Sequence, residues 1–229
     1  MCGRYTDPSS VDEAIEEFSV TRTVPDLRGY RPRFNVAPTM DGFAVVEEDG
    51  TRTLDRFFWT FIPPWSKDGK PGAFSTTNAR SDKVAESKLY APSFKSRRCI
   101  VAAGGFYEWR GREQPKQPYH ICRADRRPLA FAGVWSAWKS PVDGTTRRSF
   151  AIVTTDANGV MQPIHSRMPA ILGPDDYAPW LDSNNRDLAV LAELLRPCPD
   201  DWLEAWPVST RVNKSGTEGP DLIAPATLE

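Results

Sequence analysis

The middle of the chain decides the fold: residues 99–109 are CIVAAGGFYEW, 119–123 are YHICR, 128–135 are PLAFAGVW and 149–155 are SFAIVTT. Each stretch is short, apolar and rich in β-branched or aromatic residues, and polar or Gly/Pro segments separate them. This pattern is typical of successive strands joined by turns. We therefore expect a sheet built from neighbours along the chain, which favours antiparallel pairing.

The flanking sequence adds a hairpin and helices to this sheet. Residues 43–47 and 51–58 are strand-like on either side of Glu48-Asp49-Gly50, a strong hairpin signal. Ser10 and Glu13 predict a capping box at the start of a helix over residues 10–18. Further predictions are a helix or helical turn over residues 80–89, a short strand over 168–172, and helices over 174–181 and 187–195. The prediction is a single α+β domain over residues 1–229, with a largely antiparallel, barrel-like distorted sheet and peripheral helices.

Charge is balanced overall but uneven along the chain. With 29 basic and 30 acidic residues, the net charge of −1 excludes a protein that coats nucleic acid or membrane by bulk charge. Residues 78–98 nevertheless hold six basic and two acidic side chains, whereas residues 175–204 hold eight acidic and two basic ones. Such runs are usually solvated faces. Here the basic run adjoins the motifs described below, which favours an anionic ligand at that place.

Several classes of protein are not expected. No run approaches the roughly 20 apolar residues of a membrane span, and the first residues lack the apolar core of a signal peptide. We expect a cytoplasmic protein. The four cysteines are far apart and include no CxxC pair, so neither a metal site nor disulfides are predicted. No cofactor is expected either.

Cys2 is the first candidate for chemistry. If Met1 is removed, the α-amine of Cys2, with a pKa of about 7.7–8, and its thiol, with a pKa of about 8.5, lie two carbons apart. Such a 1,2-aminothiol condenses with an aldehyde to an imine, which the thiol closes to a thiazolidine. An internal cysteine cannot do this because its nitrogen is an amide. The alternative is an incidental buried cysteine.

Glu108 and His165 are candidates for proton transfer. Glu108 ends an apolar strand between Tyr107 and Trp109, and a carboxyl group in apolar surroundings can act as a general acid near neutrality. His165 lies in a loop between two prolines, where a histidine suits proton transfer. The alternatives are an exposed glutamate at a strand end and a histidine that braces its loop. His120, within a predicted strand, is interpreted as structural.

Polar and aromatic motifs surround these candidates. Asn78 could orient an amine or hydroxyl, and the Arg80 guanidinium could grip a phosphate, although an asparagine helix cap is a common alternative. Residues 33–39, RFNVAPT, and 62–65, IPPW, resemble rigid loops. Trp65 could stack on a base or be buried in its proline-rich loop.

Together these motifs resemble the SRAP family (SOS-response-associated peptidase), also known as abasic-site processing proteins. The matching elements follow the family order over nearly the whole chain, and they are residues 1–5 (MCGRY), 33–39 (RFNVAPT), 78–80 (NAR), 105–109 (GFYEW), 165–169 (HSRMP), 207–209 (PVS) and 212–213 (VN). Each is weak alone, but the ordered set with cysteine at position 2 is highly specific. Lys88 stands where arginine is common in bacterial members.

The resemblance implies the SRAP fold and a covalent activity on DNA. Mature Cys2 would capture the ring-opened aldehyde of an abasic site in single-stranded DNA as a thiazolidine crosslink, protecting the site during the DNA damage (SOS) response. Asn78 would position the amine, Glu108 would act as general acid–base, and His165 would transfer protons and assist reversal. The residues implied in DNA binding are Arg4, Asn35, Pro38, Trp65, Arg80, Lys88, Trp109 and Arg167.

Two other classes of function remain open from the sequence. One is a cysteine-type (auto)peptidase or N-terminal-nucleophile hydrolase, in which Cys2 attacks a carbonyl group; lyase activity on the DNA strand is a related possibility. The other is a non-covalent binder of single strands or modified bases, with Cys2 structural. The expected partner in the main interpretation is single-stranded DNA containing abasic sites, and the protein is expected to be a monomer without a membrane partner.

Overall fold

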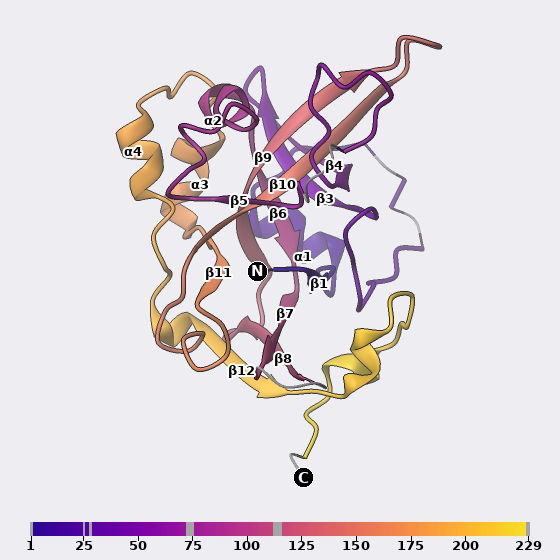
Figure 1. The fold of residues 1–229 in the computed structure, drawn as a ribbon, viewed down its shortest axis with the longest axis vertical. Helices are drawn as coiled ribbons and strands as arrows, with labels where there is room; N and C mark the ends of the chain where they lie inside the picture. Colours follow the sequence, from indigo (N-terminus) through magenta and orange to yellow (C-terminus); the bar gives the residue numbers. More distant parts are fainter. Residues whose placement is uncertain (1, 25, 28, 72–75, 112–115, 228–229) are drawn as a thin grey trace.

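A five-stranded barrel forms the centre of the molecule (Figure 1). The computed structural model describes residues 2–24, 26–27, 29–71, 76–111 and 116–227. Around the barrel the strands follow the order β10, β9, β6, β3, β4, and β4 pairs back with β10. All these pairs are antiparallel except the closing one, in which Ser149 and Phe150 lie parallel to Phe58 and Trp59. The strands are β3 (Asp41–Glu48), β4 (Thr51–Trp59), β6 (Arg98–Ala103), β9 (Leu129–Lys139) and β10 (Thr146–Asp156).

Short strands extend the barrel, and a second sheet packs beside it. β2 (Arg22–Thr23) lies on β4, while β5 (Asn78–Arg80) and β11 (Arg167–Pro169) lie on β10. The second, antiparallel sheet, called here the small sheet, has the order β1, β7, β8, β12. Its strands are β1 (Arg4–Thr6), β7 (Gly105–Arg110), β8 (Gln117–Arg123) and β12 (Leu203–Pro207). The predicted α+β class with a barrel-like, largely antiparallel sheet is confirmed.

Gly104 divides the two sheets. The sequence predicts one strand over residues 99–109, but the structure breaks it there: β6 stays in the barrel, and β7 leaves to pair with β1. The Gly104 N–H donates to the carbonyl oxygen of Thr6, and a Cβ atom at Gly104 would lie 2.5 Å from the carbonyl oxygen of Asp7. Any side chain would therefore push the N-terminal segment away, because no real contact of this kind is so short.

The local sequence signals explain most of the remaining elements. In the β3–β4 hairpin, Glu48 pairs with Thr51 and so belongs to β3, which leaves a two-residue turn; Asp49 and Gly50 have φ values of 52° and 71°, as such a turn requires. Ser10 caps α1 by accepting from the Glu13 N–H, but the Glu13 carboxylate accepts from Ser9 rather than completing the predicted capping box. The helices are α1 (Val11–Glu17), α2 (Ala91–Ser96), α3 (Pro174–Leu181) and α4 (Leu188–Glu193), with 3₁₀ turns η1 (Asp200–Trp202), η2 (Thr210–Asn213) and η3 (Pro220–Ile223).

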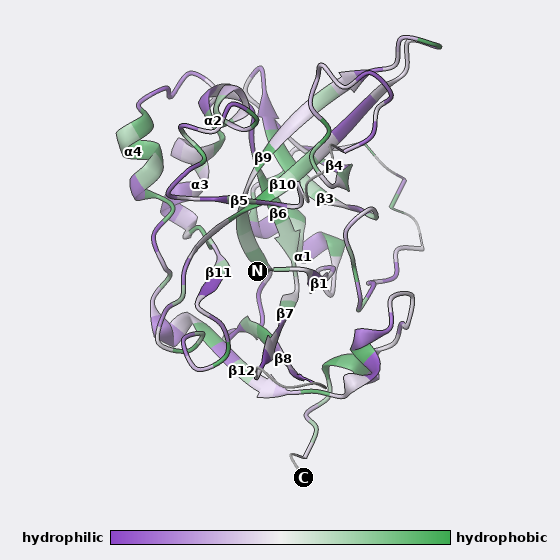
Figure 2. Cartoon of the chain, in the orientation of Figure 1, coloured by the Kyte–Doolittle hydropathy of each residue, from purple (hydrophilic) through white to green (hydrophobic). Residues whose placement is uncertain are grey.

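Apolar clusters lie on both sides of the barrel wall. Hydrophobic residues concentrate along β6 and the inner parts of β9 and β10, whereas the projecting end of the β9–β10 hairpin is largely hydrophilic (Figure 2). On the side of α1, an ion cluster joins three elements: the Glu17 carboxylate accepts hydrogen bonds from Arg123 and Tyr177 at 2.9 Å and forms an ion pair of 2.6 Å with Arg127. Because the Glu17 side chain is buried and has these three partners, the cluster links parts of the fold rather than facing a ligand.

Candidate active site

Cys2 lies buried where the barrel meets the small sheet. Its side chain packs in the apolar cluster that includes Tyr5, Phe106 and Phe150. The side-chain amide of Asn78 donates a hydrogen bond of 2.9 Å to the Cys2 carbonyl oxygen. The Cys2 thiol makes a long contact of 3.9 Å with the carbonyl oxygen of Arg4. The N-terminal segment is thus fixed at both its backbone and its side chain.

The electrostatics around Cys2 keep its thiol protonated. Burial raises the pKa of the Cys2 thiol far above its usual range, and the negative charge of Glu108 raises it further. A cysteine that attacks as a thiolate normally has a nearby cation or a helix N-terminus that lowers its pKa. Glu108 has the opposite sign, and its effect on the Cys2 pKa exceeds the lowering by the N-terminal amino group, so this site does not have the electrostatics of an activated thiolate.

Asn78 is held from two directions. β5, which carries it, lies parallel to β10 with Asn78 opposite Ile152. The Tyr90 hydroxyl donates to the Asn78 carbonyl oxygen at 3.2 Å, and the Asn78 amide lies 3.1 Å from the hydroxyl oxygen of Thr77. Tyr90 belongs to no local motif that would predict this role, because it lies just before α2 and contacts Asn78 only in the folded chain.

Glu108 enters the site from β7. It pairs with Tyr119 of β8, and its side chain is 3% exposed. Since alternate residues of a strand face opposite sides, Glu108 shares the face of Phe106, which packs in the same cluster as Cys2. The sheet register therefore brings a buried carboxylate towards the N-terminal thiol, as the electrostatic effect of Glu108 on Cys2 also indicates.

His165 is half-buried in the loop before β11, and the Arg167 N–H donates to its Nδ1 atom at 2.9 Å. The same Nδ1 atom lies 3.1 Å from the carbonyl oxygen of Arg167. His165 is therefore braced by its own loop through Nδ1.

Two arginines near this site share one carboxylate. Arg80 forms a two-pronged pair with Asp82, and Asp82 also lies 4.0 Å from the Arg167 guanidinium. Arg167 makes a second ion pair with Asp156. The pKa of Asp82 is lowered by its hydrogen bonds with Arg80. Because Asp82 is exposed, it occupies a place where a phosphate could meet both guanidinium groups.

Arg4, Asn35 and Trp109 form a different group, which fastens the C-terminal segment. Arg4 donates to the Asn35 side chain at 2.7 Å and to the Val212 carbonyl oxygen at 2.9 Å. Asn35 is fully buried, and its amide donates to carbonyl oxygens in the same segment. Trp109 donates to the side chain of Asn213 at 2.7 Å. All three side chains therefore have partners within the protein, and Trp109 is half-buried.

The remaining predicted residues reach the surface. Trp65 is 61% exposed, Lys88 is exposed and Pro38 is half-buried. The alternative that Trp65 is buried in its proline-rich loop is wrong. Large apolar side chains such as an indole are seldom this exposed, and the Trp65 ring is available for stacking.

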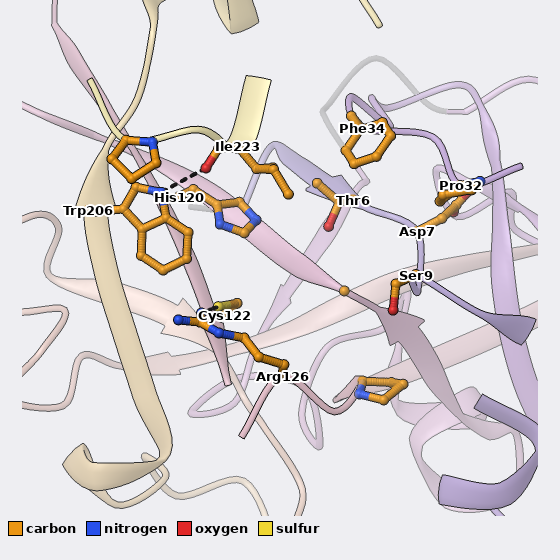
Figure 3. A pocket seen from close by; sticks show the side chains of 13 residues that line it. Thr6, Asp7, Ser9, Pro32, Phe34, His120, Cys122, Arg126, Trp206 and Ile223 are labelled. Atoms are coloured by element: carbon orange, nitrogen blue, oxygen red, sulfur yellow. Dashed lines mark hydrogen bonds between the residues drawn. The ribbon is translucent and has the colours of Figure 1, made fainter. Parts of the chain in front are cut away.

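A cavity of about 460 Å³ lies on the other face of the small sheet (Figure 3). His120, Cys122 and Trp206 line it, and they alternate with residues that face the Cys2 cluster. Burial, with a contribution from Arg126, lowers the pKa of His120 to about 3, so this ring is neutral near pH 7. The cavity is therefore separate from the site around Cys2, and the structural interpretation of His120 agrees with its burial.

In the ranges of the chain that the structure describes, no three His, Cys, Asp or Glu side chains come together in a way that could hold a metal ion. No helix in this part of the chain combines the length and the apolar character needed to cross a membrane.

These features define a class: barrel proteins with a buried cysteine at position 2, held by an asparagine and faced by a carboxylate. The chain belongs to the SOS response associated peptidase (SRAP) family, whose model matches residues 1–215. It is 36% identical over 225 residues to abasic site processing protein YoqW of Bacillus subtilis, covering 97% of this chain and 99% of that protein. It is 32% identical to abasic site processing protein HMCES of Xenopus tropicalis, covering all of this chain and 79% of that protein.

Solved structures share the fold. A protein from Bacteroides thetaiotaomicron superposes with a TM-score of 0.87 at 24% identity, covering 99% of this chain and all of that one. A phage-related protein from Bordetella bronchiseptica superposes with a TM-score of 0.70 at 29% identity, covering 90% and 94% of the two chains.

Proposed function

We propose that this protein processes abasic sites in single-stranded DNA by forming a covalent thiazolidine crosslink through Cys2 once Met1 has been removed. The observation that carries the proposal is the placement of Cys2: its carbonyl oxygen is held by Asn78, and its thiol is buried beside Glu108. The names of the relatives, abasic site processing proteins, support the choice of substrate. The protein would act on DNA in the cytoplasm as part of a damage response.

The reaction balances without an oxidant or reductant. The free α-amine of Cys2 attacks C1′ of the ring-opened sugar, and loss of one water leaves an imine. The Cys2 sulfur then bonds to the same carbon, and the thiol proton passes to the nitrogen to complete a five-membered thiazolidine. The protein gains the mass of the DNA strand minus one water.

Asn78, Glu108 and His165 would each have a place in this sequence of steps. Asn78 fixes the backbone that carries the amine, because it holds the Cys2 carbonyl oxygen. Glu108 acts as a general acid–base, which exchanges protons as the closed sugar opens and as water leaves. His165 would transfer protons and would assist the reverse reaction.

The protonated state of the thiol favours this chemistry over a cysteine peptidase. A peptidase needs a thiolate at the first step, whereas here burial and Glu108 both disfavour the thiolate. In thiazolidine formation the amine attacks first and the thiol is needed only afterwards. Reaction with an aldehyde also requires a free amine on the cysteine, and Cys2 gains one when Met1 is removed.

The surface beside the site suits a few nucleotides of single strand. Arg80 and Arg167 would hold phosphates in place of Asp82, with Lys88 adding a point charge. Trp65 and Pro38 would contact splayed bases, and stacking contributes on the order of 1–3 kcal/mol per base. A handful of cations with stacking accounts for DNA binding by a chain whose net charge is −1.

The direct test is to mix Met1-free protein with a single strand that carries one abasic site and to weigh the denatured product by mass spectrometry. We expect one adduct whose mass equals protein plus DNA minus water. The matched control inserts a bulky residue between Met1 and Cys2, which retains Met1 and leaves the Cys2 nitrogen as an amide. Binding without an adduct in the Met1-free protein, or equal adduct in the control, would contradict the proposal.

A further inference from the structure

The loop that carries Trp65 is held in one shape by its own hydrogen bonds. Within residues 63–70, called here the Trp65 loop, the Ser66 N–H donates to the Pro63 carbonyl oxygen at 2.9 Å. The Ser66 hydroxyl donates to the Lys70 carbonyl oxygen at 3.1 Å, and the Asp68 carboxylate accepts from the Lys70 N–H at 3.1 Å. The exposed indole of Trp65 therefore projects from an ordered loop.

A second tryptophan fixes this loop to the barrel. Trp138 of β9 donates its indole N–H to the carbonyl oxygen of Ser66, the residue next to Trp65, at 2.7 Å. Gly69 has a φ of +67°, and a Cβ atom there would lie 2.6 Å from the Trp138 ring. The loop thus touches Trp138 at two points, one polar and one by close packing. Since Trp138 pairs with Arg147 in the β9–β10 ladder, the loop is attached to a rigid element.

Open space lies beside the indole that this loop presents. A cavity of about 240 Å³ separates Trp65 and Pro64 from α2 and the turn before it. The cavity is lined by Leu89, Pro92 and Arg97 among others, so it combines apolar surface with a cation at its edge. A flat apolar group with a phosphate attached matches both properties.

We propose that Trp138 is a positioning residue for DNA: it fixes the Trp65 loop so that the indole is ready to stack on a base next to the abasic site. This inference rests on the proposed function, because it assigns a role to Trp65 in holding single-stranded DNA. Its physical basis is preorganisation. A loop that is already ordered loses little conformational freedom when a base stacks on it, so more of the stacking energy remains as affinity.

The test compares two variants of the support with a matched control. W138F keeps an aromatic ring on β9 but removes the N–H donor, and G69A disturbs the packing contact. The control is W206F, which removes a similar indole bond of 2.8 Å to the Ile223 carbonyl oxygen on the other face of the small sheet. We expect W138F and G69A to weaken binding to an unmodified single strand about three- to tenfold, and W206F to leave it within twofold.

A double-mutant cycle separates positioning from general destabilisation. If Trp138 acts through Trp65, then adding W138F to a W65A background leaves the affinity for DNA unchanged. We also expect W138F to raise the DNA concentration that gives half-maximal crosslinking more than it lowers the maximal rate. Effects of W138F and W65A that multiply would overturn the inference, as would unchanged affinity in W138F when W65A binds weakly.

The outcomes also separate this inference from the proposed function. A protein that binds and crosslinks abasic DNA, but whose W138F variant binds as tightly as wild type, contradicts only the role of Trp138. A protein that gives no crosslink yet shows the non-multiplicative W65A–W138F pair keeps the positioning role and contradicts the covalent chemistry.

Discussion

The two faces of the small sheet carry the same kinds of residue in opposite settings. The front face, towards the barrel, has Cys2 and Glu108, and the rear face has Cys122 with Arg126, whose guanidinium lies 2.6 Å from the sulfur. Burial raises the pKa of both thiols, but Glu108 adds to the effect at Cys2, whereas Arg126 opposes it at Cys122. The nearest charged side chain therefore favours a thiolate at Cys122 and disfavours one at Cys2.

This difference bears on which property of Cys2 the proposed chemistry would use. If reactivity required only a thiolate, the rear face would be the better place, and its cavity would admit a reagent (Figure 3). Cys2 has what Cys122 cannot have: an α-amine on the same carbon skeleton once Met1 is removed. The two faces therefore distinguish aminothiol chemistry from thiolate chemistry within one molecule.

Replacing each cysteine in turn gives the largest expected contrast. C2S leaves an amine and a hydroxyl, which does not close a stable thiazolidine, so we expect the denaturation-resistant adduct to fall by at least about 10³-fold. C122S, on the rear face, should crosslink like wild type. Gel electrophoresis after denaturation measures both. Equal loss in the two variants would show that the adduct depends on the fold and not on Cys2.

The carboxylate of the front face is expected to have the next largest effect. E108Q preserves shape but cannot donate a proton as an acid, so we expect capture of an abasic sugar, which is mostly a closed hemiacetal, to slow about 10²-fold. Capture of a simple open aldehyde should slow less, since no ring must open. Single-turnover rates for the two substrates provide the measurement. Equal slowing would remove ring opening from the role of Glu108.

On the rear face, His120 makes stability depend on pH. Its pKa is about 3 in the folded protein against about 6.5 in the unfolded chain, so the unfolded state binds more protons between these values. The free energy of unfolding is therefore reduced as pH falls from about 6.5 towards 3, by roughly 1 kcal/mol at pH 5.5. Denaturant titrations at pH 7.5 and 5.5 measure this change. The free energy of unfolding should fall less between these pH values in H120Q than in the wild type.

His165 provides the control for this measurement, because the sequence contains only two histidines. H165Q retains His120 and should lose stability between pH 7.5 and 5.5 as the wild type does. The carboxylates that also titrate in this range are common to all three proteins. An H120Q protein with the full wild-type loss would contradict the assignment to His120.

The sequence was informative where the signal was local. The hairpin turn at Asp49-Gly50 and the start of α3 at Pro174 each depend on residues within a few positions, and both predictions match the structure. At α1, Ser10 caps the helix as predicted, but Glu13 does not complete the capping box. The break at Gly104 was missed because its cause, the backbone of Asp7, lies about a hundred residues earlier. The strand β12 was missed for a similar reason, since it completes a sheet begun at the other end of the chain.

The candidate site divides in the same way. Position 2 marks Cys2 directly, and the family motifs indicate Asn78 and Glu108. The sequence does not show whether an arginine faces solvent or bonds to another part of the protein, because such partners are distant along the chain. Arg4, for example, donates to the carbonyl oxygen of Val212, more than two hundred residues away. Trp138, which supports the Trp65 loop, carries no motif because its role depends on one hydrogen bond to a backbone carbonyl group.

The smallest expected effect concerns two exposed ion pairs that are closely matched. Arg80 and Asp82 are 58% and 46% exposed near the front site, and Arg126 and Glu204 are 58% and 49% exposed on the rear face. D82N and E204Q each remove one negative charge and so raise the net charge of the protein by one. In 0.1 M salt charges act over about 10 Å, so only a charge near the DNA path changes binding strongly.

If phosphate displaces Asp82, D82N removes the competitor of the phosphate. We then expect D82N to bind a single strand about three- to fivefold more tightly, with a steeper salt dependence. E204Q should change the affinity less than twofold. Fluorescence anisotropy at two salt concentrations measures this difference. Equal tightening in both variants would mean that net charge alone controls binding and that the DNA does not pass over Arg80 and Arg167.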